Sequence, residues 1–349
     1  MRTGRIRYAF LLAMASILTL GLLAGCGGDD DVVTTPGEDR IVEVTRVVEV
    51  EKDKGPKEFT FFSVYHTFPH PFWMMMKRAA DLAGEQTNTE VDFWIGTEYS
   101  VEDQITRVEV LAAQNPDGMA VSIPDANAAD PVYRAAIDSG IPMIAVNARD
   151  PRPKSERIPY MFYVGSDEIL AGNQVANEIL ERFGTPTRVA FASPQIANIA
   201  ITERALGVQQ ILEPLGVTVD LVDVPADPTL GVEVVKGWMA ANPDTDWWVA
   251  GGAISQANVA DALIGLGLLN DGARIAGFDL GEIVTPLIQD GSVQFTIDQQ
   301  PYLQGYLPII WLYLYNKAGF LPPGDALTGP AVVDSSNIDL VASLADKFR

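Results

Sequence analysis

The two histidines of the chain, His66 and His70, lie four residues apart in the stretch HTFPHPFW. Such a pair could bind a metal ion or transfer protons. Two residues at this spacing face the same way only on a helix, and Pro69 and Pro71 prevent a helix through the stretch. The 349 residues contain no third histidine, and the single cysteine, Cys26, is insufficient to complete a zinc site. We therefore expect no metal ion and no cofactor.

The sequence also lacks the usual motifs of enzymatic catalysis. The chain has no G-x-S-x-G nucleophile elbow and no G-x-x-x-x-G-K phosphate loop. The stretch GLGLLN at 265–270 is one glycine short of a dinucleotide-binding loop and follows a helical pattern instead of a strand. We therefore expect a protein that binds a ligand without transforming it.

The residues after His70 fit a ligand-binding loop better than a catalytic one. Pro71 is well placed as the first residue of a helix, which puts Phe72 and Trp73 in its first turn. Their rings offer flat apolar faces, and a neutral His70 can donate and accept hydrogen bonds. A sugar ring needs this mixture, with aromatic faces against its C–H groups and planar polar groups at its hydroxyls. From spacing alone, packing in the core is the more frequent role of such rings.

The elements that must position this loop alternate between strands and helices. A helix is predicted over 72–83, another after the capping pair Ser100 and Asp103, and a third over 169–183. Continuous apolar strands predict parallel sheets covered by helices on both faces, and ten strands suit two doubly wound lobes. The predicted strands are 58–64, 90–96, 118–124, 141–147, 162–166, 187–193, 217–224, 247–253, 273–280 and 293–298. The apolar run 302–315 is too short to span a membrane and predicts a buried helix.

The N-terminus has the layout of a secretory signal peptide. Three arginines precede the apolar run YAFLLAMASILTLGLL, and LAGC follows. The LAGC ending resembles a bacterial lipobox, so we expect a signal peptide over 1–25, lipidation of Cys26 and a stalk over 26–57. The formal net charge of −22 becomes three units more negative when the arginines are removed. A surface this acidic repels phosphate backbones, so nucleic-acid binding is not expected.

Several stretches together resemble the type I periplasmic sugar-binding proteins of the ribose, glucose and galactose group. They are HPFW, GIPMIAVNARDP, YVGSDEILAGNQVANEIL and RIAGFDLGEIVTPLIQDGSVQFTIDQQP, and the resemblance covers nearly all of 58–320 in order. It implies an α/β fold of two doubly wound parallel-sheet lobes joined by a three-segment hinge. The N-terminal lobe would comprise 58–163 plus 301–327, and the C-terminal lobe 164–300 plus 328–349.

The resemblance also implies a set of ligand-binding residues, with some departures from the family pattern. Ile201 stands near the position of a family arginine, and Arg204 matches a neighbouring arginine outside the pocket. GGAISQ lacks the family's Asn-Asp pair, which leaves Ser255, Gln256 or Asn258 as substitutes. The implied binding residues are His70, Phe72, Trp73, Asn147, Arg149, Asn198, Gln256, Asp279 and Gln299.

Two of these residues have open alternatives. Asp279 could instead cap a helix after its strand, and Gln299 could be a hinge residue bonded to backbone. The resemblance implies a monomeric solute-binding lipoprotein outside the cytoplasm, in a periplasm or on the outer face of the membrane. It would bind a monosaccharide and deliver it to an ABC permease. The alternatives are a nucleoside, polyol or furanose signal as ligand, and a sensory receptor as partner.

Overall fold

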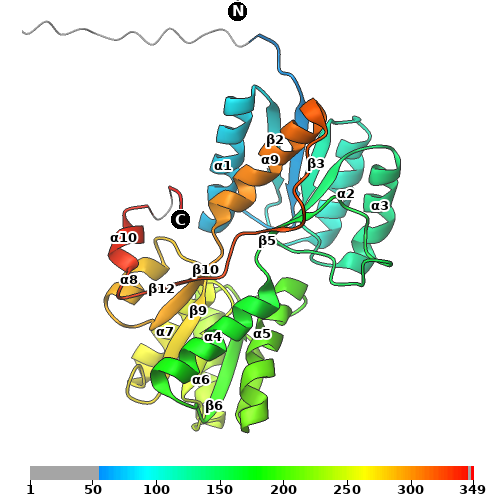
Figure 1. The fold of residues 1–349 in the computed structure, drawn as a ribbon. Coiled ribbons are helices and arrows are strands. Elements are labelled where there is room, and N and C mark those ends of the chain that lie inside the picture. Colours follow the sequence, from blue (N-terminus) through cyan, green and yellow to red (C-terminus); the bar gives the residue numbers. More distant parts are fainter. Residues whose placement is uncertain (1–54, 345–346) are drawn as a thin grey trace, which may run out of the picture. The chain divides into compact units, whose positions relative to one another are not determined.

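The computed structural model describes residues 55–344 and 347–349. The expected signal peptide, the lipidation site Cys26 and most of the stalk lie outside the described residues. The described chain alternates between strands and helices and forms two six-stranded sheets (Figure 1). Among its helices, none is both long and apolar enough to cross a membrane.

The first sheet consists of parallel strands in the order β11-β5-β4-β3-β1-β2. These strands are β1 (Thr60–Tyr65), β2 (Glu90–Ile95), β3 (Gly118–Val121), β4 (Met143–Val146), β5 (Tyr163–Gly165) and β11 (Ala326–Leu327). One face is covered by α1 (Pro71–Thr87) and α9 (Pro301–Ala318), which lie side by side in Figure 1. The other face is covered by α2 (Val101–Ala112) and α3 (Ala126–Asp138). We call this part the first lobe.

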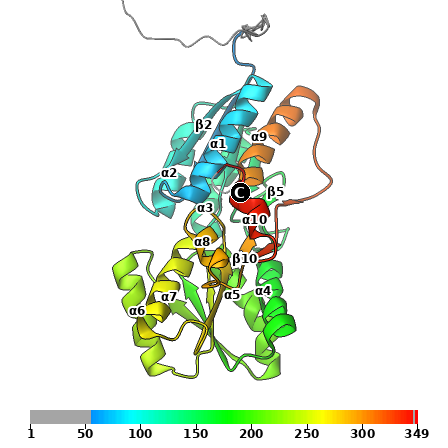
Figure 2. The same cartoon turned by 90° about the vertical axis from the view of Figure 1, so that its left-hand side faces the viewer.

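The second sheet has the order β12-β10-β9-β8-β6-β7, and β12 is its one antiparallel strand. Its strands are β6 (Arg188–Ser193), β7 (Thr218–Asp223), β8 (Trp247–Ala250), β9 (Arg274–Phe278), β10 (Phe295–Asp298) and β12 (Ala331–Asp334). One face packs against α4 (Glu168–Phe183) and α5 (Ile199–Leu212), with the 3₁₀ helix η1 (Glu213–Leu215) following α5. The other face packs against α6 (Pro228–Ala241), α7 (Ala253–Leu266), α8 (Val284–Gln289) and α10 (Ile338–Ala342). Figure 2 shows α6 and α7 on the opposite side of the strands from α4. We call this part the second lobe.

Both faces of each sheet are buried, which explains the continuous apolar runs in the sequence. Along β1, Phe61 and Tyr65 belong to the core under α1 and α9, whereas Phe62 and Val64 belong to the core under α2 and α3. Successive strand residues point to opposite faces, so a strand covered on both sides needs apolar residues at nearly every position. The ten strands and the two-lobed fold predicted from this pattern are confirmed.

The starts of α1 and α2 and the end of α4 agree with the local sequence chemistry, whereas α1 continues to Thr87, beyond the predicted end at 83. Helix α1 begins at Pro71, where the missing N–H of proline costs no hydrogen bond. The Ser100 hydroxyl oxygen accepts the backbone N–H of Asp103 at 3.1 Å, which caps α2. Helix α4 ends before Gly184, as expected. The short elements β11, β12 and α10 were not predicted.

The chain crosses between the lobes three times, at 165–168, 298–301 and 327–331. The expected lobe boundary between 163 and 164 falls inside β5. Because β5 pairs with β4 and β11, the first sheet continues to Gly165. The three crossings form the expected hinge.

Strand order determines where the two lobes can bind a ligand. In the first sheet β1 lies between β2 and β3, and in the second β6 lies between β7 and β8. The chain therefore winds in opposite directions on either side of β1 and of β6. In such sheets ligands bind beyond the carboxyl ends of the strands, next to this reversal. The loops after β1, β6 and β8 are thus the expected positions of the site.

Candidate ligand-binding site

A cavity lies among loops that follow the carboxyl ends of strands in both lobes. The cavity has a volume of about 130 Å³, roughly ten times the volume that a single buried water needs. The first lobe contributes His66, Thr67, Phe68, His70, Pro71, Phe72, Trp73 and Asn147. The polar residues of the second lobe are Gln195, Asn198, Arg204, Ser255, Asp279, Glu282 and Gln299. The space suits a small organic molecule that touches both lobes.

The start of α1 forms the aromatic wall of the cavity. The rings of Phe72 and Trp73 lie edge to face, with their centroids 5.3 Å apart. Trp73 is only 5% exposed and contacts Tyr65 in the core at a centroid distance of 5.1 Å, yet it also lines the cavity. Core packing and cavity lining are therefore not exclusive roles for this ring. Phe72 is less buried than Trp73 and also lines the cavity.

Both histidines are neutral at physiological pH. Burial, aided by the nearby His70, lowers the pKa of His66 to about 3, and burial lowers the pKa of His70 to about 4. Nδ1 of His66 shares a hydrogen bond of 2.7 Å with the hydroxyl of Ser122. Nε2 of His66 lies 3.5 Å from the amide nitrogen of Asn198 in the second lobe. A neutral imidazole can both donate and accept, which suits uncharged polar ligands.

Asp279 follows β9 and holds a carboxylate in the buried wall of the second lobe. The carboxylate accepts hydrogen bonds from the side-chain amide of Gln299 and from the backbone N–H of Ala253. Burial raises the pKa of Asp279, while the Arg204 charge and these two donors oppose the rise. Ala253 begins α7, whose N-cap is Gly252, so the carboxylate takes the place of a capping side chain. The capping role considered for Asp279, at the helix after its strand, is not observed, because α8 has Ile283 as its N-cap. The carboxylate instead caps α7, which precedes β9 in the chain.

Asn147 and Gln299 are linked through the hinge. Asn147 donates its amide to Gln304 of α9 at 3.1 Å, and Gln304 donates to the backbone oxygen of Gln299 at 3.1 Å. At the hinge, the backbone oxygen of Gln299 accepts a hydrogen bond from Gln304. The side chain of Gln299 instead donates to Asp279. Asn147 and Asp279 both have left-handed backbone conformations, with φ of 66° and 76°. Left-handed backbone at two cavity residues indicates that the surrounding structure holds them firmly.

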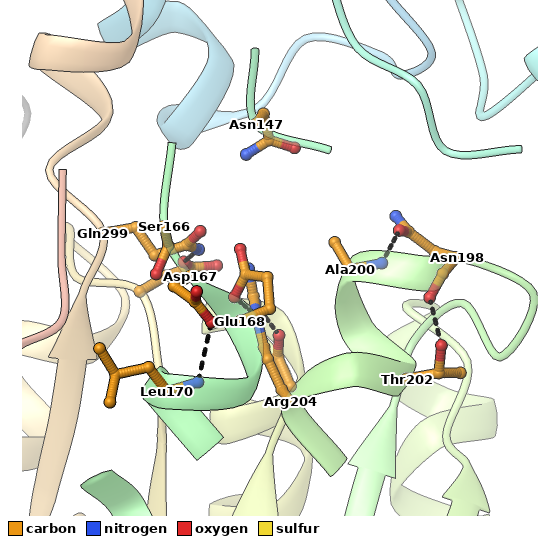
Figure 3. A network of polar contacts seen from close by, with 12 residues as sticks. Asn147, Ser166, Asp167, Glu168, Leu170, Asn198, Ala200, Thr202, Arg204 and Gln299 are labelled. Carbon is orange, nitrogen blue, oxygen red and sulfur yellow. Dashed lines mark hydrogen bonds and ion pairs between the residues drawn. The ribbon is translucent and has the colours of Figure 1, made fainter. Parts of the chain in front are cut away.

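Arg204 lines the cavity, so the expectation that it lies outside the pocket is wrong. Its guanidinium donates to both carboxylate oxygens of Glu168, at 2.7 and 3.2 Å, and to the backbone oxygen of Gly251 at 2.7 Å. Both partners are buried, and Figure 3 shows their side chains meeting between α4 and α5. The two hydrogen bonds to Glu168 make a bidentate ion pair within the second lobe. Burial raises the pKa of Glu168, and the adjacent Arg204 charge opposes this rise.

Seven of the nine expected ligand-binding residues line the cavity, and two do not. Arg149 instead lies 3.5 Å from Asp167, a residue of the second lobe. Gln256 is fully buried, and its amide donates to the backbone oxygen of Phe278 at 2.6 Å and to the hydroxyl of Thr296 at 3.2 Å. Gln256 is thus a packing residue of the second lobe. Direct ligand contact by the other seven, which are His70, Phe72, Trp73, Asn147, Asn198, Asp279 and Gln299, stays a prediction.

Asn198 has most of its polar capacity occupied by the protein. Its side-chain oxygen accepts the backbone N–H of Ala200 at 3.0 Å and thereby caps α5 (Figure 3). Its amide donates to Gln195 at 3.1 Å. Asn198 therefore mainly stabilises the cavity wall, and few of its hydrogen-bonding groups remain for a ligand.

Several cavity-lining residues were not in the predicted set, among them His66, Arg204 and Ser255, of which Ser255 was considered only as a substitute. His66 directly follows β1, and Ser255 lies in the first turn of α7 after β8, so both are next to the reversals in strand order. That topological rule could have found these two from sequence. Among the described residues, no group of three or more His, Cys, Asp or Glu side chains could hold a metal ion.

Comparison with known proteins gives consistent matches. The model of the family described as periplasmic binding protein domain matches residues 61–318. The chain is 33% identical over 258 residues to the xylose/arabinose-binding protein XylF of Sulfolobus acidocaldarius, a match that covers 70% of this chain and 63% of that protein's length.

Two solved structures share the fold over most of their length. One is a carbohydrate transporter from Acidothermus cellulolyticus 11B in complex with myo-inositol, with 28% identity and a TM-score of 0.74 over 83% of this chain and 98% of the other. The second is a periplasmic sugar-binding protein of an ABC sugar transporter from Legionella pneumophila. It is 27% identical, with a TM-score of 0.72 over 78% of this chain and 99% of the other.

Proposed function

The chain belongs to the periplasmic binding protein domain family, and we propose that it captures a monosaccharide between its two lobes. The observation that carries the proposal is the pairing of two unlike walls around one cavity. Rings at the start of α1 form one wall, and the buried carboxylate of Asp279 with the amide of Gln299 forms the other. A sugar ring offers C–H faces to the first wall and hydroxyls to the second.

The polar wall is prepared for hydroxyl groups. The Asp279 carboxylate is fixed by donors on two sides and retains lone pairs that can accept from a ligand. The side-chain oxygen of Gln299 has no partner among the described residues and can accept as well. A hydrogen bond to a charged group contributes about 1.5–3 kcal/mol, so a few such bonds and one aromatic contact can supply the roughly 8 kcal/mol of micromolar binding.

Two relatives suggest which ligands come first. The Sulfolobus acidocaldarius relative is named a xylose/arabinose-binding protein, so pentoses are our first candidates. The Acidothermus cellulolyticus structure contains myo-inositol, which makes a cyclic polyol the second candidate. Both are neutral polyhydroxylated rings, and both suit a cavity whose histidines are uncharged.

Calorimetric titration of the purified protein tests the ligand class. The panel contains D-xylose, L-arabinose, D-ribose, D-glucose, D-galactose, myo-inositol, and adenosine as a representative nucleoside. We expect micromolar binding of at least one sugar or the cyclitol. Tight binding of adenosine with no response to any sugar or polyol would contradict the proposal.

We also propose that the protein acts outside the cytoplasm, attached to the membrane through lipidated Cys26, and delivers its ligand to an ABC permease. The signal-like N-terminus and the LAGC stretch support the anchor, and the family supports the transport role. Mass spectrometry of the N-terminal peptide should find a diacylglyceryl group on Cys26. A Cys26→Ala variant should be released from the membrane fraction, and retention of that variant would argue against the anchor.

A further inference from the structure

Arg149 belongs to the first lobe but directs its charge to the second. It lies in the loop between β4 and β5, both strands of the first sheet. Its guanidinium is 3.5 Å from the carboxylate of Asp167, which lies at the second-lobe end of the first hinge crossing and caps α4. The same guanidinium lies over the Tyr163 ring, 5.7 Å from its centroid. Arg149 thus joins the two lobes beside the hinge.

The second lobe has two acidic side chains toward this arginine. Burial lowers the pKa of Arg149, and the charges of Asp167, the N-cap of α4, and of Glu203 on α5 raise it. Burial raises the pKa of Glu203, and the charge of Arg149 opposes that rise. The Asp167 side chain has a fixed position, because its other carboxylate oxygen accepts the backbone N–H of Leu170 at 3.0 Å.

The neighbouring residues in sequence have a different partner. Glu168 and Arg204, each adjacent to one of these acids, pair with each other inside the second lobe. In that pair the negative charge of Glu168 is balanced by the positive charge of Arg204. Asp167 and Glu203 can therefore interact with a cation from the first lobe. Arg149 supplies it, two residues after Asn147 of the cavity wall.

We propose that Arg149 is a positioning residue, which stabilises the closed arrangement of the two lobes through Asp167 and Glu203 without contacting the ligand. The proposal rests on the proposed function, because closure matters only if a ligand binds between the lobes. Since the contact bridges the two lobes, its loss should shift the equilibrium toward separated lobes and speed ligand release. The choice among ligands should not change.

Variants of the pair test this by calorimetry with D-xylose and L-arabinose. Arg149→Gln should weaken both about two- to five-fold by the same factor, as expected for a partly exposed ion pair, and Arg149→Lys should weaken them less. Asp167→Asn keeps the helix cap but removes the charge, so the Arg149→Gln/Asp167→Asn double variant should bind no more weakly than Arg149→Gln alone. Unchanged affinity, additive losses or an altered xylose-to-arabinose ratio would each overturn the proposal.

A matched control exists in the same lobe. Arg107 lies 3.6 Å from Asp92, and its side chain is 34% exposed against 25% for Arg149, but both partners belong to the first lobe. Arg107→Gln removes the same charge and should leave both affinities unchanged. An equal loss in this control would mean that overall charge, and not the contact between lobes, is responsible.

A measurement without ligand separates this proposal from the proposed function. Nitroxide labels on Ala135→Cys and Ala240→Cys, exposed positions on α3 and α6, report the distance between lobes in a Cys26→Ser background. Arg149→Gln should broaden this distance distribution relative to the parent and to Arg107→Gln. If no sugar binds the parent protein, the proposed function fails. The distance distributions still test whether Arg149 holds the two lobes together. Identical distributions in all three proteins would overturn its role.

Discussion

Gln299 donates its side-chain N–H to the carboxylate of Asp279, and this hydrogen bond joins the ends of the adjacent parallel strands β10 and β9. Gln299 also stands at the second hinge crossing, immediately before Gln300 and Pro301. One of the proposed hydroxyl acceptors is therefore held by the hinge itself. Movement of the hinge and the strength of binding at Asp279 should be coupled.

Asp279→Asn should weaken the tightest-binding sugar or polyol by about ten-fold or more, because a bond to a charged group is replaced by a neutral one. Asparagine can still accept from Ala253, so the free energy of unfolding should change little. Calorimetry and urea denaturation measure the two effects. Asp271→Asn, at an exposed position of the second lobe, is the control. Equal affinities of Asp279→Asn and this control would remove Asp279 from the site.

Phe72 and Trp73 should respond differently to truncation. Trp73 is almost fully buried, so Trp73→Ala should lower the free energy of unfolding of the ligand-free protein by about 3–5 kcal/mol and weaken binding too. Phe72 is less buried, and Phe72→Ala should weaken binding with a smaller loss of stability. Denaturation and titration of both variants check this. Similar stability losses would show that Phe72 is as much a core residue as Trp73.

The free energy of unfolding should rise with pH between about 4 and 6.5. Burial lowers the pKa of His70 to about 4 from its ordinary 6.5, so in this range the unfolded chain binds a proton there that the folded chain does not. His66 acts in the same direction over a wider range. His70→Gln should reduce the slope by up to about 1.4 kcal/mol per pH unit, measured by urea denaturation across the range.

The control for the pH experiment adds a histidine where it should titrate alike in both states. Gln114 is exposed at the start of the loop after α2, so Gln114→His should leave the slope unchanged. Parallel pH profiles of the parent and His70→Gln would mean that His70 is not shielded from water.

Arg204→Met should destabilise the protein by about 3–5 kcal/mol, because it leaves the buried carboxylate of Glu168 without its charge partner. Arg204→Met/Glu168→Leu should regain most of that stability, because no unpaired buried charge remains. In comparison, Arg188 pairs with Asp220 at the surface, and Arg188→Met should cost about 1 kcal/mol or less. Denaturation of all three variants checks this, and equal losses in Arg204→Met and Arg188→Met would contradict a buried pair.

Most of the fold could be predicted because burial on both faces leaves a strong trace in the sequence. The runs at β1 and β6 are apolar at nearly every position, and the turns between elements carry recognisable caps such as Ser100. β11 is two residues long and exposed in part, so its sequence has too few apolar positions to mark a strand. Its place is set by pairing with β5, which no local pattern records.

The site was harder to predict because side-chain direction depends on tertiary contacts. Asn147, Asp279 and Gln299 directly follow strands, and strand ends alone bring them to one cavity. Arg149 lies two residues farther along its loop, where the acids of the second lobe attract it. Gln256 lies one turn into α7, and there its amide meets backbone oxygens instead of the cavity.

The left-handed backbone at Asn147 and Asp279 limits how this pocket can evolve. Asparagine and aspartate tolerate positive φ better than most residues, whereas β-branched side chains are strongly disfavoured there. Mutational drift at these two positions is therefore restricted by chain geometry before any ligand imposes selection. Ala226 and Ile254 line the same cavity with ordinary backbone conformations and are free to vary. New ligand preferences should therefore arise through substitutions at such neighbouring positions. Asn147 and Asp279 should be retained in related proteins that bind different ligands.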